Sequence, residues 1–158
     1  MCLRFKGFGG KKVTAKEYLN QAFYIDKQIN ENCLELESLD SDVCRRTQKF
    51  SDMPSCENNS NRIEIGLANY IDKCEDLRQK INESSDLLAD TKKDIRSKIY
   101  QIKSPKFRLV LAKRYILFKK WERIQDEMKY QDLRSVYKLH NKALIEFIKI
   151  HGNNFSGH

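Results

Sequence analysis

Apolar side chains recur at alternating steps of four and three residues through two long stretches of this 158-residue chain. This spacing is the heptad pattern of helices that pack along a narrow apolar seam. With only six Gly and two Pro, the sequence has few of the turn signals that separate strands, so we expect an all-α fold. The first seam comprises Tyr18, Ala22, Ile25, Ile29, Asn32, Leu36, Leu39 and Val43. The second comprises Ile63, Leu67, Tyr70, Cys74, Leu77, Ile81, Ser84, Leu88, Thr91, Ile95, Ile99 and Ile102.

The two seams predict a long antiparallel helical hairpin over residues 14–103. Thr14 and Glu17 have the spacing of a capping box at the start of the first helix. Residues 50–60 are rich in Asp, Asn and Ser and contain Pro54, so we expect them to form the connecting loop. The second helix is longer than the first, so its distal part, near Ser84 to Ile102, needs a further partner. That partner is either the C-terminal domain or a second copy of the chain. We expect a homodimer through the hairpin, and a simple spacer is the alternative interpretation.

Three short helices are expected over residues 104–151. The Ser-Pro pair at residues 104–105 begins the first, because Pro is well tolerated in the first turn of a helix. Breaks at residues 117–120 and 129–131 separate the middle helix from its neighbours, and Asp132 precedes the last one. A short middle helix with a tight connection to the last is typical of a helix-turn-helix domain.

Positive charge is concentrated toward the two ends of the sequence. Residues 104–158 carry 12 basic and five acidic side chains, and residues 1–13 carry four basic and no acidic ones. The intervening residues 14–103 carry 14 basic and 17 acidic side chains. This asymmetry favours a polyanionic partner, and double-stranded DNA is the one that suits a helix-turn-helix domain. We expect residues 1–13 to form a basic extension and residues 152–158 a short tail.

The last of the three helices is the candidate recognition helix. Its apolar face comprises Val136, Leu139, Ala143 and Phe147. Arg and Lys side chains lie outside this face. An Arg guanidinium can form two hydrogen bonds with the edge of a guanine base, whereas a Lys ammonium can neutralise a phosphate without strict geometry. The candidates for base contact are Arg134, Ser135, Tyr137 and Lys138. The candidates for phosphate contact are Lys119, Lys120, Arg123 and Lys142.

Residues in both halves of the chain occur in an order that is typical of a known family. They are Arg114-Tyr115, Trp121-Glu122, Ile124, Met128, Tyr130, Arg134, Val136, Leu139-His140 and Ala143-Leu144, together with residues 14–19 and 51–54 in the N-terminal half. With these residues the chain resembles region 4 of sigma-70-type RNA polymerase factors. It is still more similar to the RinA and ArpU type late-gene activators of phages and integrative elements in Gram-positive bacteria. The resemblance covers residues 14–147 and implies a sequence-specific DNA-binding regulator, with RNA polymerase as a further candidate partner.

Three positions around the middle helix depart from that family's pattern. Lys120 stands where a capping Thr is usual, Gln125 where a small Ala is usual, and Lys129 where a Gly is usual. A left-handed backbone at Lys129 would be strained, because its side chain has a Cβ atom. The connection at residues 131–133 is one residue longer than the common pattern. We therefore expect an altered turn before the recognition helix.

The sequence holds no motif that points to catalysis or to metal binding. It has no Gly-rich phosphate loop and no HExxH motif, and its five Cys lack CxxC spacing. We expect free thiols, with Cys33 and Cys74 as small core residues. Trp121 and His140 are interpreted as packing residues. These observations predict a protein that is not an enzyme and that needs no metal and no other cofactor.

Two further expectations concern location and the alternative function. No apolar run approaches the roughly 18 residues that a membrane span needs, so we expect a cytoplasmic protein without membrane contacts. The alternative to a DNA-binding regulator is an adaptor protein. Its three-helix domain would bind RNA polymerase or another regulator, with weak DNA binding or none.

Overall fold

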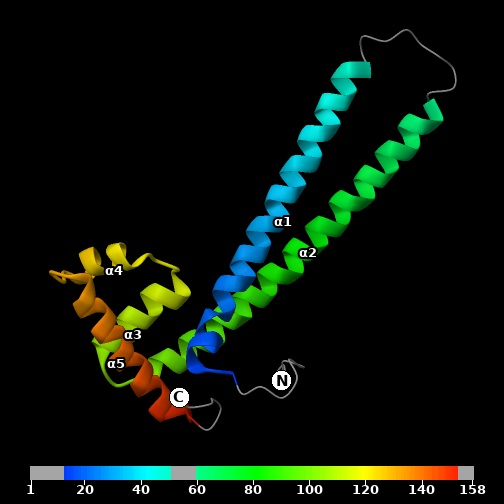
Figure 1. The fold of residues 1–158 in the computed structure, drawn as a ribbon. Helices are drawn as coiled ribbons and strands as arrows, with labels where there is room; N and C mark the ends of the chain where they lie inside the picture. Colours follow the sequence, from blue (N-terminus) through cyan, green and yellow to red (C-terminus); the bar gives the residue numbers. More distant parts are fainter. Residues whose placement is uncertain (1–12, 51–59, 153–158) are drawn as a thin grey trace. The chain divides into compact units, whose positions relative to one another are not determined.

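The structure, a computed structural model, describes residues 13–50 and 60–152. Every element in this part of the chain is helical, which confirms the all-α prediction. The elements are α1 (Ala15–Phe50), α2 (Ser60–Tyr100), α3 (Pro105–Leu111), the π-helical turn η2 (Ala112–Ile116), α4 (Trp121–Met128) and α5 (Leu133–His151) (Figure 1). The predicted extension at residues 1–13, loop at residues 50–60 and tail at residues 152–158 lie almost wholly outside the described residues.

The described chain divides into two compact units that differ in charge. One unit consists of residues 24–89, and the other combines residues 13–23 with residues 90–152. The first range carries eight basic and 14 acidic side chains, and we call it the acidic unit. The second carries 18 basic and eight acidic side chains, and we call it the basic unit. The predicted domain boundary at residue 104 stays a prediction.

In the acidic unit, α1 and α2 pair along the predicted seam. Cys74 and Leu77 are buried, which bears out the interpretation of Cys74 as a core residue, whereas Cys33 is half-buried. The Tyr70 hydroxyl donates a hydrogen bond to the Asp40 carboxylate across the pair. The remaining described seam positions on both helices are half-buried, with one exception. Leu67, in the first turns of α2, is 50% exposed.

The first turns of α1 belong to the basic unit and carry the predicted capping box. The Thr14 amide donates to the Glu17 carboxylate at 2.8 Å, and the Glu17 amide donates to the Thr14 hydroxyl at 3.3 Å. One turn later the Tyr18 hydroxyl donates to the Asp94 carboxylate and accepts from Lys98 Nζ at 2.9 Å. Burial, together with Asp94, raises the pKa of Tyr18 well above its usual range. This start of α1 is therefore fixed to α2 by polar contacts.

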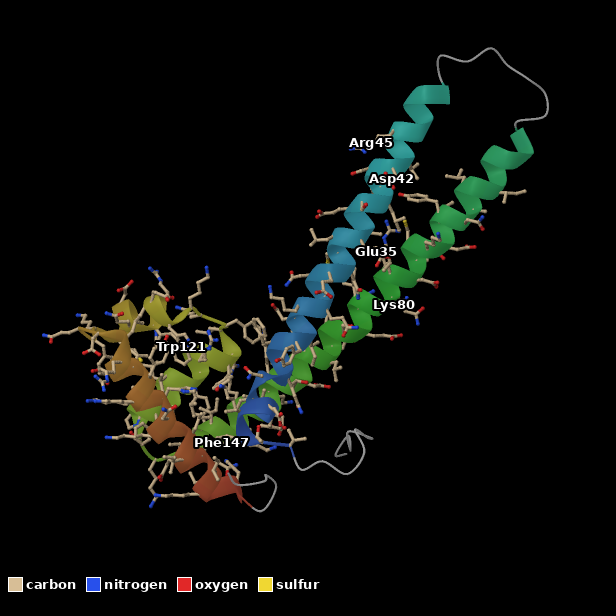
Figure 2. All side chains as sticks on the ribbon, viewed as in Figure 1. Glu35, Asp42, Arg45, Lys80, Trp121 and Phe147 are labelled. Atoms are coloured by element: carbon tan, nitrogen blue, oxygen red, sulfur yellow. The ribbon has the colours of Figure 1, made fainter. Side chains whose placement is uncertain are left out.

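The core of the basic unit joins six helical elements. Its buried apolar side chains are Leu19 and Ala22 of α1, Ile95 and Ile99 of α2, Val110 and Leu111 of α3, Ile116 of η2, Ile124 of α4, and Val136, Ala143 and Phe147 of α5. Phe147 is fully buried beside the Tyr18 ring, at 6.4 Å between centroids. Figure 2 labels Phe147 and Trp121 in this unit, and Glu35 and Asp42 on the exposed surface of α1 in the acidic unit. The core holds α3, α4 and α5 together as a three-helix group.

Candidate nucleic-acid interface

The connection into α4 is fixed by one arginine. Arg114 Nη1 donates to the Lys119 carbonyl at 3.0 Å, and the guanidinium lies 4.6 Å from the centre of the Trp121 ring. Phe118 in this connection has a positive φ of 52°. Its ring packs edge-on against Phe23, at 5.7 Å between centroids. A left-handed conformation is costly for a non-Gly residue, and the packing on both sides of the connection offsets that cost.

The expected alteration of the turn between α4 and α5 stays a prediction, but the structure places the three residues on which it depends. Lys129 ends α4 in the left-handed conformation, at φ 55° and ψ 44°, which is costly for a residue with a Cβ atom. Lys120 occupies the N-cap position of α4 without a side-chain cap. Gln125 Nε2 donates to the Tyr130 and Gln131 carbonyls, at 3.2 Å each. The Gln125 side chain therefore stabilises this turn, which an Ala at that position could not do.

Asp132 sets where the candidate recognition helix begins. Its carboxylate accepts from the Ser135 amide at 2.6 Å and from the Ser135 hydroxyl at 3.1 Å. This is an N-cap, which satisfies backbone donors that the first turn leaves free. The hydroxyl of Ser135, a predicted base contact, is thus engaged in the cap, and the side chain is half-buried.

The other predicted residues of α5 share its exposed face. Arg134, Lys138 and Lys142 are exposed and follow one another every four residues, so they form a single stripe along the helix. No ion pair joins them to an acidic side chain in the described part of the chain. Tyr137 is 41% exposed, and its ring meets the Trp121 ring edge-on at 5.0 Å. The structure therefore brings Arg134, Lys138 and Lys142 together and leaves Tyr137 beside them, partly covered.

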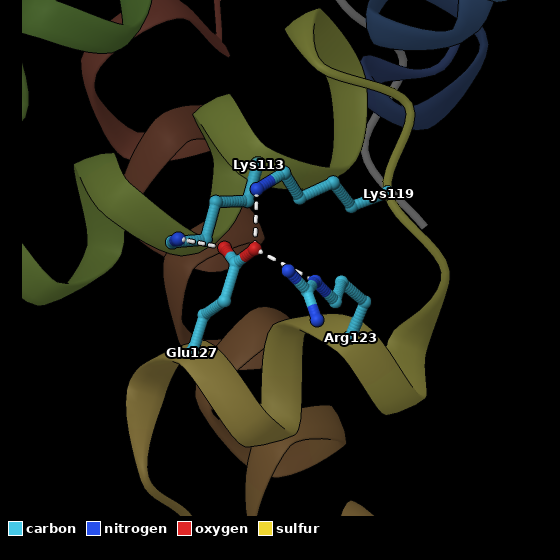
Figure 3. Close-up of polar contacts among 4 residues, drawn as sticks. All are labelled: Lys113, Lys119, Arg123 and Glu127. Atoms are coloured by element: carbon cyan, nitrogen blue, oxygen red, sulfur yellow. Dashed lines mark hydrogen bonds and ion pairs between the residues drawn. The ribbon is translucent and has the colours of Figure 1, made fainter.

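The predicted phosphate contacts of the α4 region divide into two kinds. Lys120 is exposed at the start of α4. Lys119 and Arg123 instead contact the Glu127 carboxylate, which also binds Lys113 of η2 (Figure 3). Lys113 and Glu127 are not among the residues predicted from the sequence. The spacing of Arg123 and Glu127, four residues apart on one helix, was the available signal for part of this cluster.

His140 is a buried packing residue, as the sequence predicts. It is 5% exposed, and its Nε2 atom and the Tyr115 hydroxyl form a hydrogen bond of 2.9 Å. The Trp121 ring lies edge-on against it at 4.9 Å. Burial lowers the pKa of His140 to about 4 and raises that of Tyr115 to about 12. Both groups are therefore neutral near pH 7, and Trp121, half-buried in this cluster, packs as expected.

The described residues offer no other site chemistry. Among them, no group of three His, Cys, Asp or Glu side chains is placed to hold a metal ion. Within residues 13–50 and 60–152, none of the helices combines the length and the apolar character that crossing a bilayer requires.

Comparison with known protein families, curated proteins and solved structures gives no match for this chain. The resemblance to the phage late-gene activators therefore stays a prediction.

Proposed function

We propose that this chain is a sequence-specific DNA-binding regulator of a phage or other mobile element, and that α5 enters the major groove. The observation that carries this proposal is the exposed stripe of Arg134, Lys138 and Lys142 on α5. A stripe of exposed cations that form no ion pair with the described acidic residues is suited to a polyanion, and a purely structural helix face has no need of it. The source in a mobile element rests on the sequence resemblance alone.

The dimensions of α5 suit this role. An α-helix with its side chains is about 10–12 Å across, and the major groove is about 12 Å wide. From Arg134 to Lys142 the helix rises about 12 Å at 1.5 Å per residue. In this proposal Arg134, Tyr137 and Lys138 approach base edges or nearby phosphates, and Ser135 acts mainly through the Asp132 cap. Lys120 and Lys142 contact the phosphate backbone.

We further propose that the protein works in the cytoplasm as a homodimer through α1 and α2. Support comes from the acidic unit, where Leu67 and Ile71 of α2 are 50% and 46% exposed. A second copy that covered these side chains would remove apolar surface from water. The acidic charge of residues 24–89 repels DNA, so DNA contact is confined to the basic unit. A dimer would read two half-sites about 34–36 Å apart, or a multiple of that distance.

The test of DNA binding is a comparison of Arg134→Ala with Lys149→Ala. Both variants lose one exposed cation of α5, but Lys149 lies near the C-terminal end of the helix and pairs with Glu146. Binding is measured by salt titration on a pool of DNA fragments that includes the flanks of the protein's own gene. We expect Arg134→Ala to cost about 1–3 kcal/mol on the preferred fragment and to relax the preference. We expect Lys149→Ala to leave the preference unchanged.

Two results would contradict the proposal. Equal effects of the two substitutions would mean that α5 does not read sequence through its N-terminal turns. If the wild-type chain bound none of the fragments at low salt, the adaptor function would be favoured. Ile145, 55% exposed on α5, is the observation that favours that alternative, because an exposed apolar side chain can be covered by a protein partner. Capture of RNA polymerase by the wild-type chain, lost in Ile145→Asp, would then establish it.

A further inference from the structure

Three cations from three segments meet at one carboxylate beside the candidate recognition helix. Lys113 extends from η2, Lys119 from the connection that follows it, and Arg123 from α4. All three bind Glu127 of α4, with Arg123 Nε donating at 3.1 Å (Figure 3). One negative charge thus gathers three positive ones, and the cluster has a surplus of two positive charges.

The members of this cluster differ in exposure. The side chains of Lys113 and Glu127 are 14% and 21% exposed, so they form the covered base of the cluster. Lys119 is 30% exposed and Arg123 is 70% exposed, so they form its open side. Hydrogen bonds from Lys113 and Lys119 hold the pKa of Glu127 at about 2. Glu127 is therefore ionised near pH 7.

The surplus charge has donors available for a second anion. Arg123 uses Nε for Glu127, and the two Nη groups of a guanidinium carry four further N–H donors. Lysine carries three N–H donors on its Nζ atom. Without a carboxylate between them, three like charges would repel one another, and the long side chains would separate in solvent. The Glu127 carboxylate lowers the net positive charge of the cluster by one, but it holds the three cations close together.

From this geometry we infer that Lys113, Lys119 and Arg123 form a site for one phosphodiester group of the DNA backbone, and that Glu127 is its positioning residue. The inference rests on the proposed function, and it assigns a role to two residues that the sequence analysis did not select. In this inference the contribution of Lys119 and Arg123 to DNA affinity depends on where Glu127 holds them and not on their charge alone. Glu127 acts through the cations and does not touch the DNA.

The test is a comparison of Glu127→Gln with Asp126→Asn. Each substitution adds one positive charge to the net charge, and Asp126 is an exposed neighbour on the same helix. If charge alone mattered, both variants would bind DNA more tightly. We expect Asp126→Asn to raise affinity about twofold and Glu127→Gln to lower it about tenfold, with a salt slope that is shallower by about one phosphate contact. The probe is a mixed-sequence duplex of about three helical turns, titrated over a range of salt concentrations.

A second pair of variants keeps the test decisive if Glu127→Gln does not fold. Glu127→Asp keeps the charge but withdraws the carboxylate by one methylene, and Glu122→Asp makes the same change at an exposed position of α4. Circular dichroism and the fluorescence of Trp121 report whether each variant is folded at the temperature of the binding assay. We expect Glu127→Asp to bind less tightly than the wild type, and Glu122→Asp to bind equally. If Glu127→Gln is unfolded, this second pair decides.

The outcomes separate this inference from the proposed function. If the wild-type chain binds no duplex, the proposed function fails. If the wild type binds but Glu127→Gln gains affinity as Asp126→Asn does, or Glu127→Asp binds as the wild type does, only the positioning role is overturned. A third measurement titrates inorganic phosphate against the wild type. Binding of phosphate that Glu127→Gln abolishes, with duplex affinity equal in both proteins, would mean that the cluster takes free phosphate, and the DNA contact would be refuted.

Discussion

The basic and acidic units use the same heptad spacing, but the depth of burial along it differs. In the basic unit, Ile95 and Ile99 of α2 are at most 1% exposed. In the acidic unit, Cys74 and Leu77 are the buried apolar side chains among the described residues, and the rest of the seam is half-buried or exposed. The same helix thus shows a deep core in one unit and a shallow seam in the other.

The difference shows what a heptad pattern does and does not specify. The spacing decides which face of a helix packs, but the depth of the core depends on how many elements cover that face. Two helices cover each other along one line, whereas α3, η2 and α5 add further apolar surface in the basic unit. The charge follows the same division, because the basic unit carries the surplus of Lys and Arg, and the acidic unit the surplus of Asp and Glu. We expect the stability of the protein to depend mainly on the basic unit.

The largest expected effect comes from the core of the basic unit. Phe147→Ala removes a fully buried ring that packs against Tyr18 and His151, and we expect it to cost about 3–5 kcal/mol. Leu77→Ala in the acidic unit removes a side chain that is 6% exposed, beside a shallow seam that can close around the gap. We expect it to cost about 2 kcal/mol. Urea unfolding gives both values.

The single tryptophan of the chain makes this comparison selective. Trp121 lies in the basic unit, so its fluorescence follows that unit, whereas far-ultraviolet circular dichroism follows the helices of both. Phe147→Ala should shift the fluorescence transition. Leu77→Ala should shift the dichroism transition more than the fluorescence. Equal costs by both probes would show that the difference in burial has no energetic meaning.

Acid should destabilise the basic unit through His140. Its pKa of about 4 lies below the ordinary value of 6.5, so the unfolded chain binds more protons between these two pH values. Stability is therefore complete above pH 6.5 and falls as the pH drops toward 4, by about 3 kcal/mol in all. Residues 24–89 contain no His, and their unfolding should not change over that window.

Two variants separate the causes of this pH dependence. His140→Gln has no titrating ring, and its stability should be flat between pH 6.5 and pH 5.5. Below that range the loss that comes from Glu127, with its pKa of about 2, remains. Tyr115→Phe leaves the His140 ring in place and removes the hydroxyl that is hydrogen-bonded to it. We expect this variant to lose about 1–3 kcal/mol of stability at pH 7 but to retain the dependence of stability on pH. A slope that disappears in Tyr115→Phe would mean that the hydrogen bond, and not burial, lowers the pKa of His140.

The helices could be predicted from the sequence because their signals are local. The capping box at Thr14, the Pro at position 105 and the left-handed residue at Lys129 each depend on a few neighbouring residues. Ser104 stands at the N-cap of α3 as expected, but its side chain makes no cap bond. The π-helical turn η2 was not anticipated, because a single widened turn has no distinctive spacing.

The candidate site was less predictable because its contacts join distant segments. Nothing in the order of residues indicates that Lys113 and Lys119 share Glu127, since that contact depends on how η2 and α4 pack. The guanidinium of Arg114 packs on Trp121 and binds a backbone carbonyl, a contact that depends on how the connection into α4 folds. The stripe on α5 was predictable, because one helix with a known apolar face determines what remains outside.

The turn before α5 offers a smaller effect. Lys129→Gly should stabilise the basic unit by about 1 kcal/mol, because Gly adopts the left-handed conformation at φ 55° without strain. Lys129→Ala is the matched control, since it removes the same charge but keeps the Cβ atom. The fluorescence of Trp121 during urea unfolding measures both. If Lys129→Ala stabilised the unit as much as Lys129→Gly, the gain would come from the lost charge and not from the backbone.

The smallest effect is expected in the acidic unit. Gly66 lies in α2, where a Cβ atom would have no neighbour within 4 Å, so Gly66→Ala adds helix propensity without a clash. We expect a gain of about 0.5–1 kcal/mol, because Ala loses less backbone freedom on folding than Gly does. Ala68→Gly, at an exposed position of the same helix, should lose a similar amount. Both changes should alter the dichroism transition and leave the Trp121 transition in place. An equal shift in both probes would show that the two units unfold together, and the shallow seam would then share the stability of the deep core.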